Sequence, residues 1–160
     1  MPDAPAVSLQ TTLAVRDACL CLHTQRAARA LARRFDEVLR PAGLTNGQFS
    51  LLNALNGPAP APMSRVAATL GADRTTLTAA LKPLVREGLA LVSVDPDDQR
   101  ARRVALTAAG RARLAAALPL WAAAHAALET ELADPDRARG DLLALSAPRP
   151  GLAAAPICES

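Results

Sequence analysis

The sequence contains few aromatic residues, with two phenylalanines, one tryptophan and no tyrosine among its 160 residues. Proteins that bind single-stranded nucleic acid stack the bases on several aromatic side chains, so this scarcity argues against that activity. Three cysteines are too few for the disulfide framework of a small secreted domain, and their odd number is typical of a reducing compartment. We therefore expect a fold held together without disulfide bonds.

Long apolar runs are also missing, since no segment approaches the roughly 20 apolar residues that cross a membrane. No stretch before the first expected helix has the pattern of a secretory signal peptide. The sequence contains no phosphate-binding loop, zinc-protease motif or nucleophile elbow. We therefore expect a cytoplasmic protein with no membrane contact, which is not an enzyme and needs neither a cofactor nor a metal ion.

Positive charge is concentrated in one part of the chain. Residues 64–113 contain nine Lys/Arg and five Asp/Glu, whereas residues 114–160 contain three and six. Seventeen of the eighteen cationic residues are arginines, which bond phosphate or guanine through two parallel hydrogen bonds. Genomic composition bias explains this arginine usage equally well. The position of the excess charge nevertheless favours nucleic acid as a partner.

Helix-forming residues dominate the first part of the sequence, and 51% of the whole chain is hydrophobic. Apolar residues recur every three or four positions over residues 12–40, which predicts one amphipathic helix. Pro41 and Gly43 end it. Thr45 and Gln48 have the spacing of a capping box and predict the start of a second helix.

Residues 64–88 have the pattern of a helix-turn-helix, in which Ser64 and Asp73 cap the two helices and Gly71 marks the turn. Side chains near the start of the second helix can reach DNA, where arginine binds guanine and threonine contacts a thymine methyl group or a phosphate. Arg74 is the candidate for reading a base. A solvated helix carries similar polar residues, and only their place in the motif favours DNA. The candidate DNA contacts in this motif are Ser64, Arg65, Arg74, Thr75, Thr76, Thr78 and Lys82.

Residues 89–107 predict a β-hairpin, because two short runs rich in β-branched residues flank a turn with three acidic residues. Arg100, Arg102 and Arg103 follow this turn. An arginine at the tip of a hairpin can enter a narrow minor groove, whose negative potential attracts it. Arg102 and Arg103 point to opposite faces of their strand, so at most one of them should contact phosphates. The alternative is a charged turn that only interacts with solvent.

A helix-turn-helix followed by a basic hairpin is a winged helix-turn-helix, whose usual partner is duplex DNA. Thr107 then caps a long helix, in which apolar residues recur every three or four positions from Leu114 to Leu132. One helix cannot bury such a seam alone, so we expect a homodimer. Asp134 opens a last helix that ends near Leu145. The expected fold class is mainly α with a small β-hairpin wing.

This order of elements resembles the MarR family of transcriptional regulators from about residue 12 to residue 145. The matching positions are Asp98-Gln99-Arg100, Leu106-Thr107 and Gly110, which are similar to the family's D-x-R…L-T-x-x-G run, together with Gly43-Leu44-Thr45, Gln48-Phe49, Leu84 and Gly88-Leu89. The resemblance implies that Asp98 steadies Arg100 as this arginine enters a minor groove. The short, glycine-bearing last helix and the long Pro/Ala tail depart from the family pattern.

We expect a helical dimerisation region (residues 12–44 and 107–146), a winged helix-turn-helix (residues 45–106) and a flexible tail (residues 147–160). The predicted function is that of a homodimeric transcriptional regulator, a repressor that binds pseudo-palindromic double-stranded DNA. Two alternatives stay open at this point. A winged helix can serve as a protein-interaction module, although an arginine-rich wing favours DNA, and the cysteines are compatible with a thiol-based redox sensor.

The resemblance also implies a trigger, either a small aromatic or acidic effector or an oxidant, acting where the dimerisation helices meet the DNA-binding domain. Arg26 is placed to hold the carboxylate of an aromatic acid, with Trp121 and Phe49 as apolar walls. His125 has two readings, as a packed histidine or as a sensor of ligand or pH. The effector or redox candidates are Cys19, Cys21, His23, Arg26, Phe49, Trp121 and His125.

Cys19 and Cys21 are two positions apart on the expected first helix, so they face different ways and should not bond to each other. Arg16 and His23 lie within one turn of Cys19 and favour a reactive sulfur there. A helical wheel places Cys21 at the edge of the apolar stripe and Cys19 outside it. The alternative interpretation is that both cysteines are small apolar residues that only pack against their neighbours. Cys19 and His23 also have a metal-ligand spacing, but no third ligand follows at a convincing distance in sequence.

Overall fold

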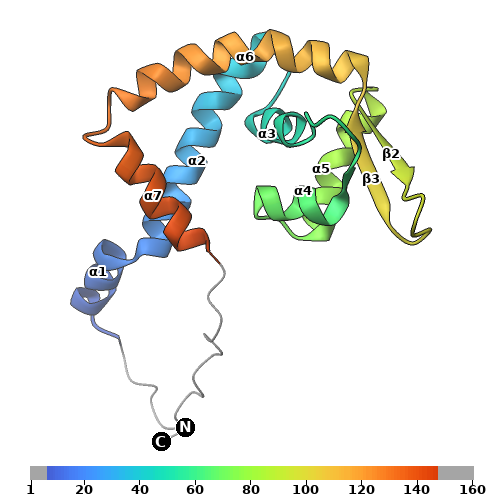
Figure 1. Ribbon diagram of the computed structural model, residues 1–160. Helices are drawn as coiled ribbons and strands as arrows, with labels where there is room; N and C mark the ends of the chain where they lie inside the picture. Colours follow the sequence, from blue (N-terminus) through green and yellow to red (C-terminus); the bar gives the residue numbers. More distant parts are fainter. Residues whose placement is uncertain (1–6, 148–160) are drawn as a thin grey trace, which may run out of the picture.

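A computed structural model describes residues 7–147 of the chain (Figure 1). The elements in this range are α1 (Leu9–Ala18), α2 (Leu20–Leu39), the 3₁₀ helix η1 (Arg40–Ala42), α3 (Asn46–Ala54), β1 (Ala61–Pro62), α4 (Met63–Leu70), α5 (Arg74–Arg86), β2 (Ala90–Val94), β3 (Arg102–Leu106), α6 (Ala108–Glu129) and α7 (Pro135–Ser146). The three strands form an antiparallel sheet in the order β1-β3-β2. The predicted fold class, mainly α with a small hairpin wing, is confirmed.

Helix α6 runs along the top of the molecule in Figure 1, from the hairpin at one end to the turn before α7 at the other. Helix α2 packs against both α6 and α3. Helices α3, α4 and α5 and the hairpin form a separate lobe to the right of α2, and α1 lies at the far end of α2. The salt bridge of 2.8 Å between Arg34 and Glu131 ties α2 to the turn that follows α6.

The core fills this lobe and its junction with α2 and α6. Helix α5 contributes Leu77, Leu81 and Leu84, which recur on one helical face. The remaining buried apolar residues include Phe35, Leu39, Phe49, Leu51, Leu52, Val66, Leu89, Val104, Leu106, Leu114 and Ala117. Helices α1 and α7 bury no residue within the chain. Their apolar side chains therefore stay available for contact with another molecule.

Four helices begin where the sequence predicts. Thr45 Oγ1 accepts a hydrogen bond from the N–H of Gln48 at 3.2 Å, and Gln48 Oε1 accepts one from the N–H of Thr45 at 2.9 Å. This completes the predicted capping box of α3. Asp73, Thr107 and Asp134 cap α5, α6 and α7 by accepting a bond from the N–H three residues later.

The end of α5, the hairpin and the start of α6 meet at one backbone junction. Thr107 Oγ1 donates to the carbonyl of Gly88 at 2.7 Å, and the N–H of Thr107 donates to the carbonyl of Leu89 at 3.1 Å. Gly110, one turn into α6, lies so close that a Cβ added there would be 3.0 Å from the carbonyl carbon of Leu89. Only glycine fits this approach, which explains the glycine after Leu106-Thr107.

The helix expected over residues 12–40 is in fact two helices, so that prediction was wrong. Cys19 has an extended backbone (φ −75°, ψ 102°) and separates α1 from α2. Its Sγ accepts a hydrogen bond from the N–H of Leu22 at 3.4 Å and so caps α2. Since α1 buries no residue, no tertiary packing holds it in line with α2.

Two further boundaries differ from the prediction. Helix α4 begins at Met63 with Pro62 as its cap residue, so Ser64 lies inside the first turn and does not cap the helix. Strand β1 pairs Ala61 with Val104 and Pro62 with Arg103, and this pairing carries the chain straight into α4. Helix α6 ends at Glu129, before the predicted end of the seam at Leu132. The predicted flexible tail from residue 148 onward lies outside the described residues.

Candidate nucleic-acid interface

Helix α5 is held at its start by Asp73. One carboxylate oxygen accepts the N–H of Thr76 at 2.7 Å, and the other accepts the Thr76 hydroxyl at 2.9 Å. These bonds lower the pKa of Asp73 below its usual value, with the backbone N–H as the larger cause. Because Thr76 Oγ1 donates to Asp73, this hydroxyl proton is already used within the chain.

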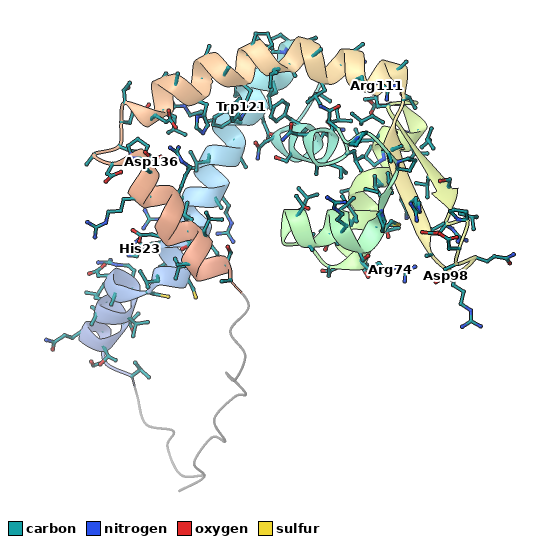
Figure 2. All side chains as sticks on the ribbon, in the orientation of Figure 1. His23, Arg74, Asp98, Arg111, Trp121 and Asp136 are labelled. Carbon is teal, nitrogen blue, oxygen red and sulfur yellow. The ribbon has the colours of Figure 1, made fainter. Side chains whose placement is uncertain are left out.

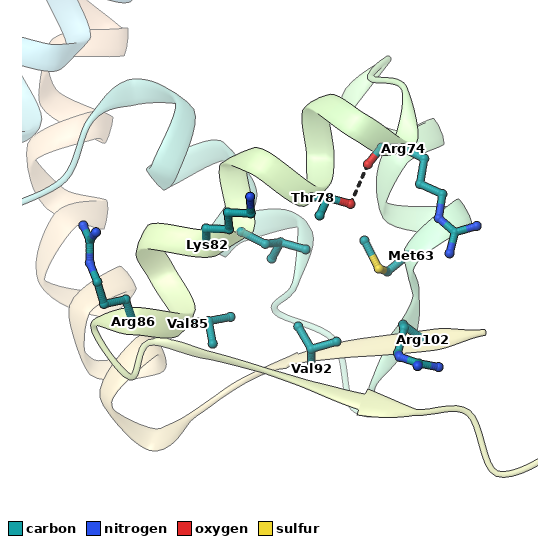
Figure 3. A pocket seen from close by; sticks show the side chains of 9 residues that line it. Met63, Arg74, Thr78, Lys82, Val85, Arg86, Val92 and Arg102 are labelled. Carbon is teal, nitrogen blue, oxygen red and sulfur yellow. Dashed lines mark hydrogen bonds between the residues drawn. The ribbon is translucent and has the colours of Figure 1, made fainter. Parts of the chain in front are cut away.

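The face of α5 opposite the buried leucines is polar and exposed. Arg74, Thr75, Thr78 and Lys82 all lie on exposed positions of the helix. Thr78 Oγ1 donates to the carbonyl of Arg74 at 2.7 Å, so its side chain offers a methyl group and an acceptor to the outside (Figure 3). Within residues 7–147 the guanidinium of Arg74 and the amine of Lys82 make no side-chain hydrogen bond, and both are free to contact another molecule.

The shortest ion pair of the wing joins Arg103 to Asp95. Arg103 Nε lies 2.6 Å from Asp95 Oδ2, and the other oxygen of Asp95 accepts the N–H of Asp97 at 3.0 Å. The bond to Arg103 is the main cause that holds the pKa of Asp95 below its usual value. Asp95 is the one buried charged residue in the described part of the chain. Arg103 therefore acts inside the wing, on the face opposite Arg102.

The tip of the wing is ordered through its backbone. Asp98 Oδ1 accepts the N–H of Arg100 at 2.9 Å, so the acid of the D-x-R run holds the main chain of the turn. The guanidinium of Arg100 makes no bond among residues 7–147 and is exposed at the tip. Arg102 Nη1 donates to the carbonyls of Gln99 and Ala101, at 2.8 and 2.9 Å, which fixes this side chain beside the tip.

A groove of about 500 Å³ separates α5 from the wing (Figure 3). The apolar side chains that line it are Met63, Leu81, Val85 and Val92, and the cationic ones are Arg74, Lys82, Arg86 and Arg102. A neighbouring hollow of about 310 Å³ lies between α4 and the tip, and its polar lining residues are Ser64, Arg74, Asp98, Arg100 and Arg102. The structure thus brings most of the predicted DNA-contacting residues to one surface, where Arg74 and Asp98 lie at the same end of the lobe (Figure 2).

Arg65 does not join this surface, because it lines another hollow together with Thr69 and Arg103. Arg86, by contrast, is a cationic residue of the groove that the sequence analysis missed. Its signal was available, since Arg74, Thr78, Lys82 and Arg86 follow one another at four-residue spacing on one helix. Within residues 7–147, no helix is both long enough and apolar enough to cross a membrane.

Solved structures with this arrangement include DNA-bound regulators. The transcriptional regulator MosR of M. tuberculosis in complex with DNA is 43% identical, with a TM-score of 0.75 over 80% of this chain and 93% of MosR. The transcriptional repressor CouR bound to a 23-mer DNA duplex is 30% identical, with a TM-score of 0.67 over 88% of this chain and 96% of CouR. A MarR-family regulator from Rhodococcus sp. RHA1 has the same fold at 22% identity and a TM-score of 0.68, over 90% of this chain and 99% of that protein.

The chain belongs to the MarR family of transcriptional regulators. The predicted resemblance is thereby confirmed, and a family of transcriptional regulators agrees with the prediction that the chain is not an enzyme. No protein-family model and no curated protein sequence matches the chain.

Three of the effector candidates lie together where the lobe formed by α3, α4, α5 and the hairpin meets α2 and α6. The ring of Trp121 stacks on Phe49 at a centroid distance of 5.9 Å and on His125 at 4.6 Å. His125 Nδ1 lies 3.5 Å from Glu129 Oε1. Phe49 is buried, so these rings fill the junction by packing on one another.

The other candidates lie elsewhere on α2. His23, at the far end of α2 from Trp121 in Figure 2, contacts the carbonyl of Asp17 through Nε2 at 3.0 Å. Arg26 lines a hollow with Arg29 and Arg33. It is nine residues, or about 13 Å of helix, from the Phe35 ring that contacts His125. The structure therefore does not bring Arg26 together with Trp121 and Phe49 in one pocket.

The positions of the two cysteines correct their prediction. Cys19 is half-buried and Cys21 is exposed, which reverses the order that the helical wheel predicts. Because Cys19 lies at an extended cap position, the argument that two helical cysteines must face apart does not apply. Arg16, expected to act on Cys19, instead pairs with Asp17 at 2.6 Å. In the described part of the chain, no group of three or more His, Cys, Asp or Glu residues is placed to hold a metal ion.

Proposed function

We propose that this chain is a homodimeric repressor that binds pseudo-palindromic double-stranded DNA in the cytoplasm. The observation that carries the proposal is the cationic groove between α5 and the wing, because it brings arginines and a lysine from separate elements to one surface. Two relatives with this arrangement are DNA-bound, which supports the same partner here. The proposed contacts on this surface are Ser64, Arg74, Thr75, Thr76, Thr78, Lys82, Arg100 and Arg102. Asp98 and Arg103 order the wing, and Arg65 lies outside this surface.

The first experiment is the recovery of bound duplexes from a random DNA pool by the full chain. We expect a pseudo-palindromic site with half-sites about 10 bp apart or a multiple of that spacing, because a dimer places two recognition helices in successive major grooves. A protein that retains no sequence above the unselected pool would contradict the proposal. In that case the surface would belong to a protein-interaction module.

Arg100→Ala tests the wing. Removing an exposed guanidinium from the tip should weaken binding to the selected site by about 1–3 kcal/mol and leave the unfolding midpoint unchanged. Arg137→Ala is the matched control, since Arg137 is also an exposed arginine and lies on α7, away from this surface. Equal affinities of the two variants in a fluorescence-anisotropy titration would remove the wing from the proposed interface.

The dimer is supported by leucines that the chain leaves exposed. Leu13 in α1 is 38% exposed, Leu20 in α2 65%, Leu118 in α6 48%, and Leu132 in the turn after α6 44%. Leu114 of the predicted α6 row is buried in the chain's own core, so we propose that only these exposed leucines are buried across a two-fold axis. Sedimentation at micromolar concentration should show a dimer, and a monomer would contradict the proposal.

We also propose that a small aromatic or acidic molecule, or an oxidant, releases the protein from DNA. The two triggers are separated by measuring peroxide-induced release for the native chain, Cys19→Ser and Cys21→Ser. Loss of release in either variant supports the thiol trigger. Peroxide insensitivity of the native chain would refute the thiol trigger.

A further inference from the structure

Helix α5 presents two different exposed faces. The buried leucines Leu77, Leu81 and Leu84 define its inner direction. At about 100° per residue, Thr75 and Ala79 lie about 150–170° from that direction, whereas Arg74 lies only about 50° from it. All three are exposed. Thr75 and Ala79 therefore form an outward ridge, and Arg74 lies on the flank.

The flank that carries Arg74 faces the wing. Arg74 and Arg102 both line the groove between α5 and the wing, and both also line the hollow at the wing tip. Val85 points toward Val92 across the groove in Figure 3. This side of α5 thus has an apolar floor and a cationic rim, formed jointly with the hairpin.

The position of this groove determines which part of DNA it meets. A recognition helix in a major groove and a wing in the adjacent minor groove have one sugar–phosphate strand between them, because that strand divides the two grooves. The cationic rim, including Arg74 and Arg102, is complementary to the phosphates of that strand. The apolar floor offers nothing that can bond to a base edge, but it fits the C–H surface of deoxyribose.

The outward ridge has a different chemistry. Thr75 and Ala79 expose methyl groups, and no side-chain hydrogen bond of Thr75 occurs within residues 7–147. The amine of Lys82 points away from the hairpin in Figure 3. In a major groove, alanine and threonine methyl groups contact the C5-methyl group of thymine, and lysine binds the O6 and N7 acceptors of guanine.

We infer that Thr75 and Ala79 read thymine methyl groups in each half-site, that Lys82 reads guanine, and that Arg74 binds the DNA backbone. The inference rests on the proposed DNA-binding function and differs from the sequence-based choice of Arg74 as the base-reading residue. It makes the ridge of α5 the determinant of sequence preference. The arginines Arg74 and Arg102 of the groove beside the ridge supply affinity without sequence preference.

Uracil substitution tests the ridge, because uracil lacks only the methyl group of thymine. Each thymine of the selected half-site is replaced in turn, and the dissociation constants of the native chain are measured. We expect about a fourfold loss at a contacted thymine, the effect of one methyl group left in water. Thr75→Ser, which removes the methyl group and keeps the hydroxyl, should abolish the loss at one position. Thr69→Ser, at an exposed threonine of α4 that is not among the proposed contacts, is the matched control and should keep the native pattern.

Arg74→Ala tests the backbone assignment. It should weaken binding to the selected site and to an unrelated duplex by the same factor, and lower the slope of log K against log salt by about one. The base preference and the uracil pattern should stay unchanged. The inference would be overturned if Arg74→Ala lost its preference at a single G·C pair and bound the unrelated duplex as the native chain does. It would also be overturned if no uracil substitution weakened binding by the native chain. Absence of binding to any duplex would instead refute the proposed function itself.

Discussion

Gly110→Ala is the substitution whose effect the structure defines most sharply. Gly110 lies in the first turn of α6, against the start of the wing. An added Cβ would stand well inside van der Waals contact of the Leu89 carbonyl oxygen, 3.0 Å from its carbonyl carbon and 3.3 Å from Leu106 Cδ2. The obstacle is backbone, which cannot rotate away as a side chain can.

Two opposing effects decide whether Gly110→Ala raises or lowers the free energy of unfolding. Alanine is favoured over glycine in a helix by at most about 1 kcal/mol. Overpacking a core position costs typically about 1–3 kcal/mol, and a backbone obstacle places this case toward the upper end. We expect a net loss of about 2 kcal/mol in the free energy of unfolding. With a urea dependence of about 2 kcal/mol per molar, the midpoint should fall by about 1 M.

The assay is urea unfolding followed by circular dichroism, with all variants at one protein concentration because a dimer's stability depends on it. Gly140→Ala in α7 is the control, since nothing lies within 4 Å of a Cβ at that glycine. This control should raise the free energy of unfolding by about 0.5–1 kcal/mol. If Gly110→Ala were as stable as Gly140→Ala, the argument from the junction would be refuted.

Two further predictions concern the wing and the cap of α6. Folding lowers the pKa of Asp95, so its pairing with Arg103 stabilises the protein fully above the unfolded-state pKa of about 3.9 and is lost as the pH falls through the folded-state value. The free energy of unfolding, measured by urea unfolding, should therefore fall less steeply at acid pH in Asp95→Asn than in the native chain. An unchanged dependence on pH would exclude this ion pair as its source. Thr107→Ala should lower the free energy of unfolding by about 1 kcal/mol in the same assay, since it loses both the cap and the bond to Gly88, and a loss below about 0.3 kcal/mol would contradict that role.

The sequence predicts best what short-range chemistry determines. The capping box at Thr45, the caps at Asp73, Thr107 and Asp134, and the hairpin all depend on residues a few positions apart. Such signals are read directly from spacing. The alternation that separates Arg102 from Arg103 is of the same kind, and the structure places the two guanidinium groups on opposite faces.

The features that the sequence did not predict depend on contacts between residues far apart in the chain, or on the lack of such contacts. Strand β1 exists only through pairing with β3, about forty residues later, and Ala61 and Pro62 carry no strand signal of their own. The break at Cys19 has no proline or glycine to announce it. The groove at the candidate site was equally hidden, because Val85 and Val92 meet only after α5 and the hairpin fold against each other.

The junction at Gly88, Thr107 and Gly110 attaches the start of α6 rigidly to the lobe that contains α5 and the wing. Helix α6 has 22 residues and is about 33 Å long, and the junction fixes one of its ends to the recognition helix and the wing. A displacement of about 3 Å at the other end corresponds to a tilt of about 5° at the junction. A small rearrangement at the α7 end of α6 would therefore change the angle at which α5 is presented.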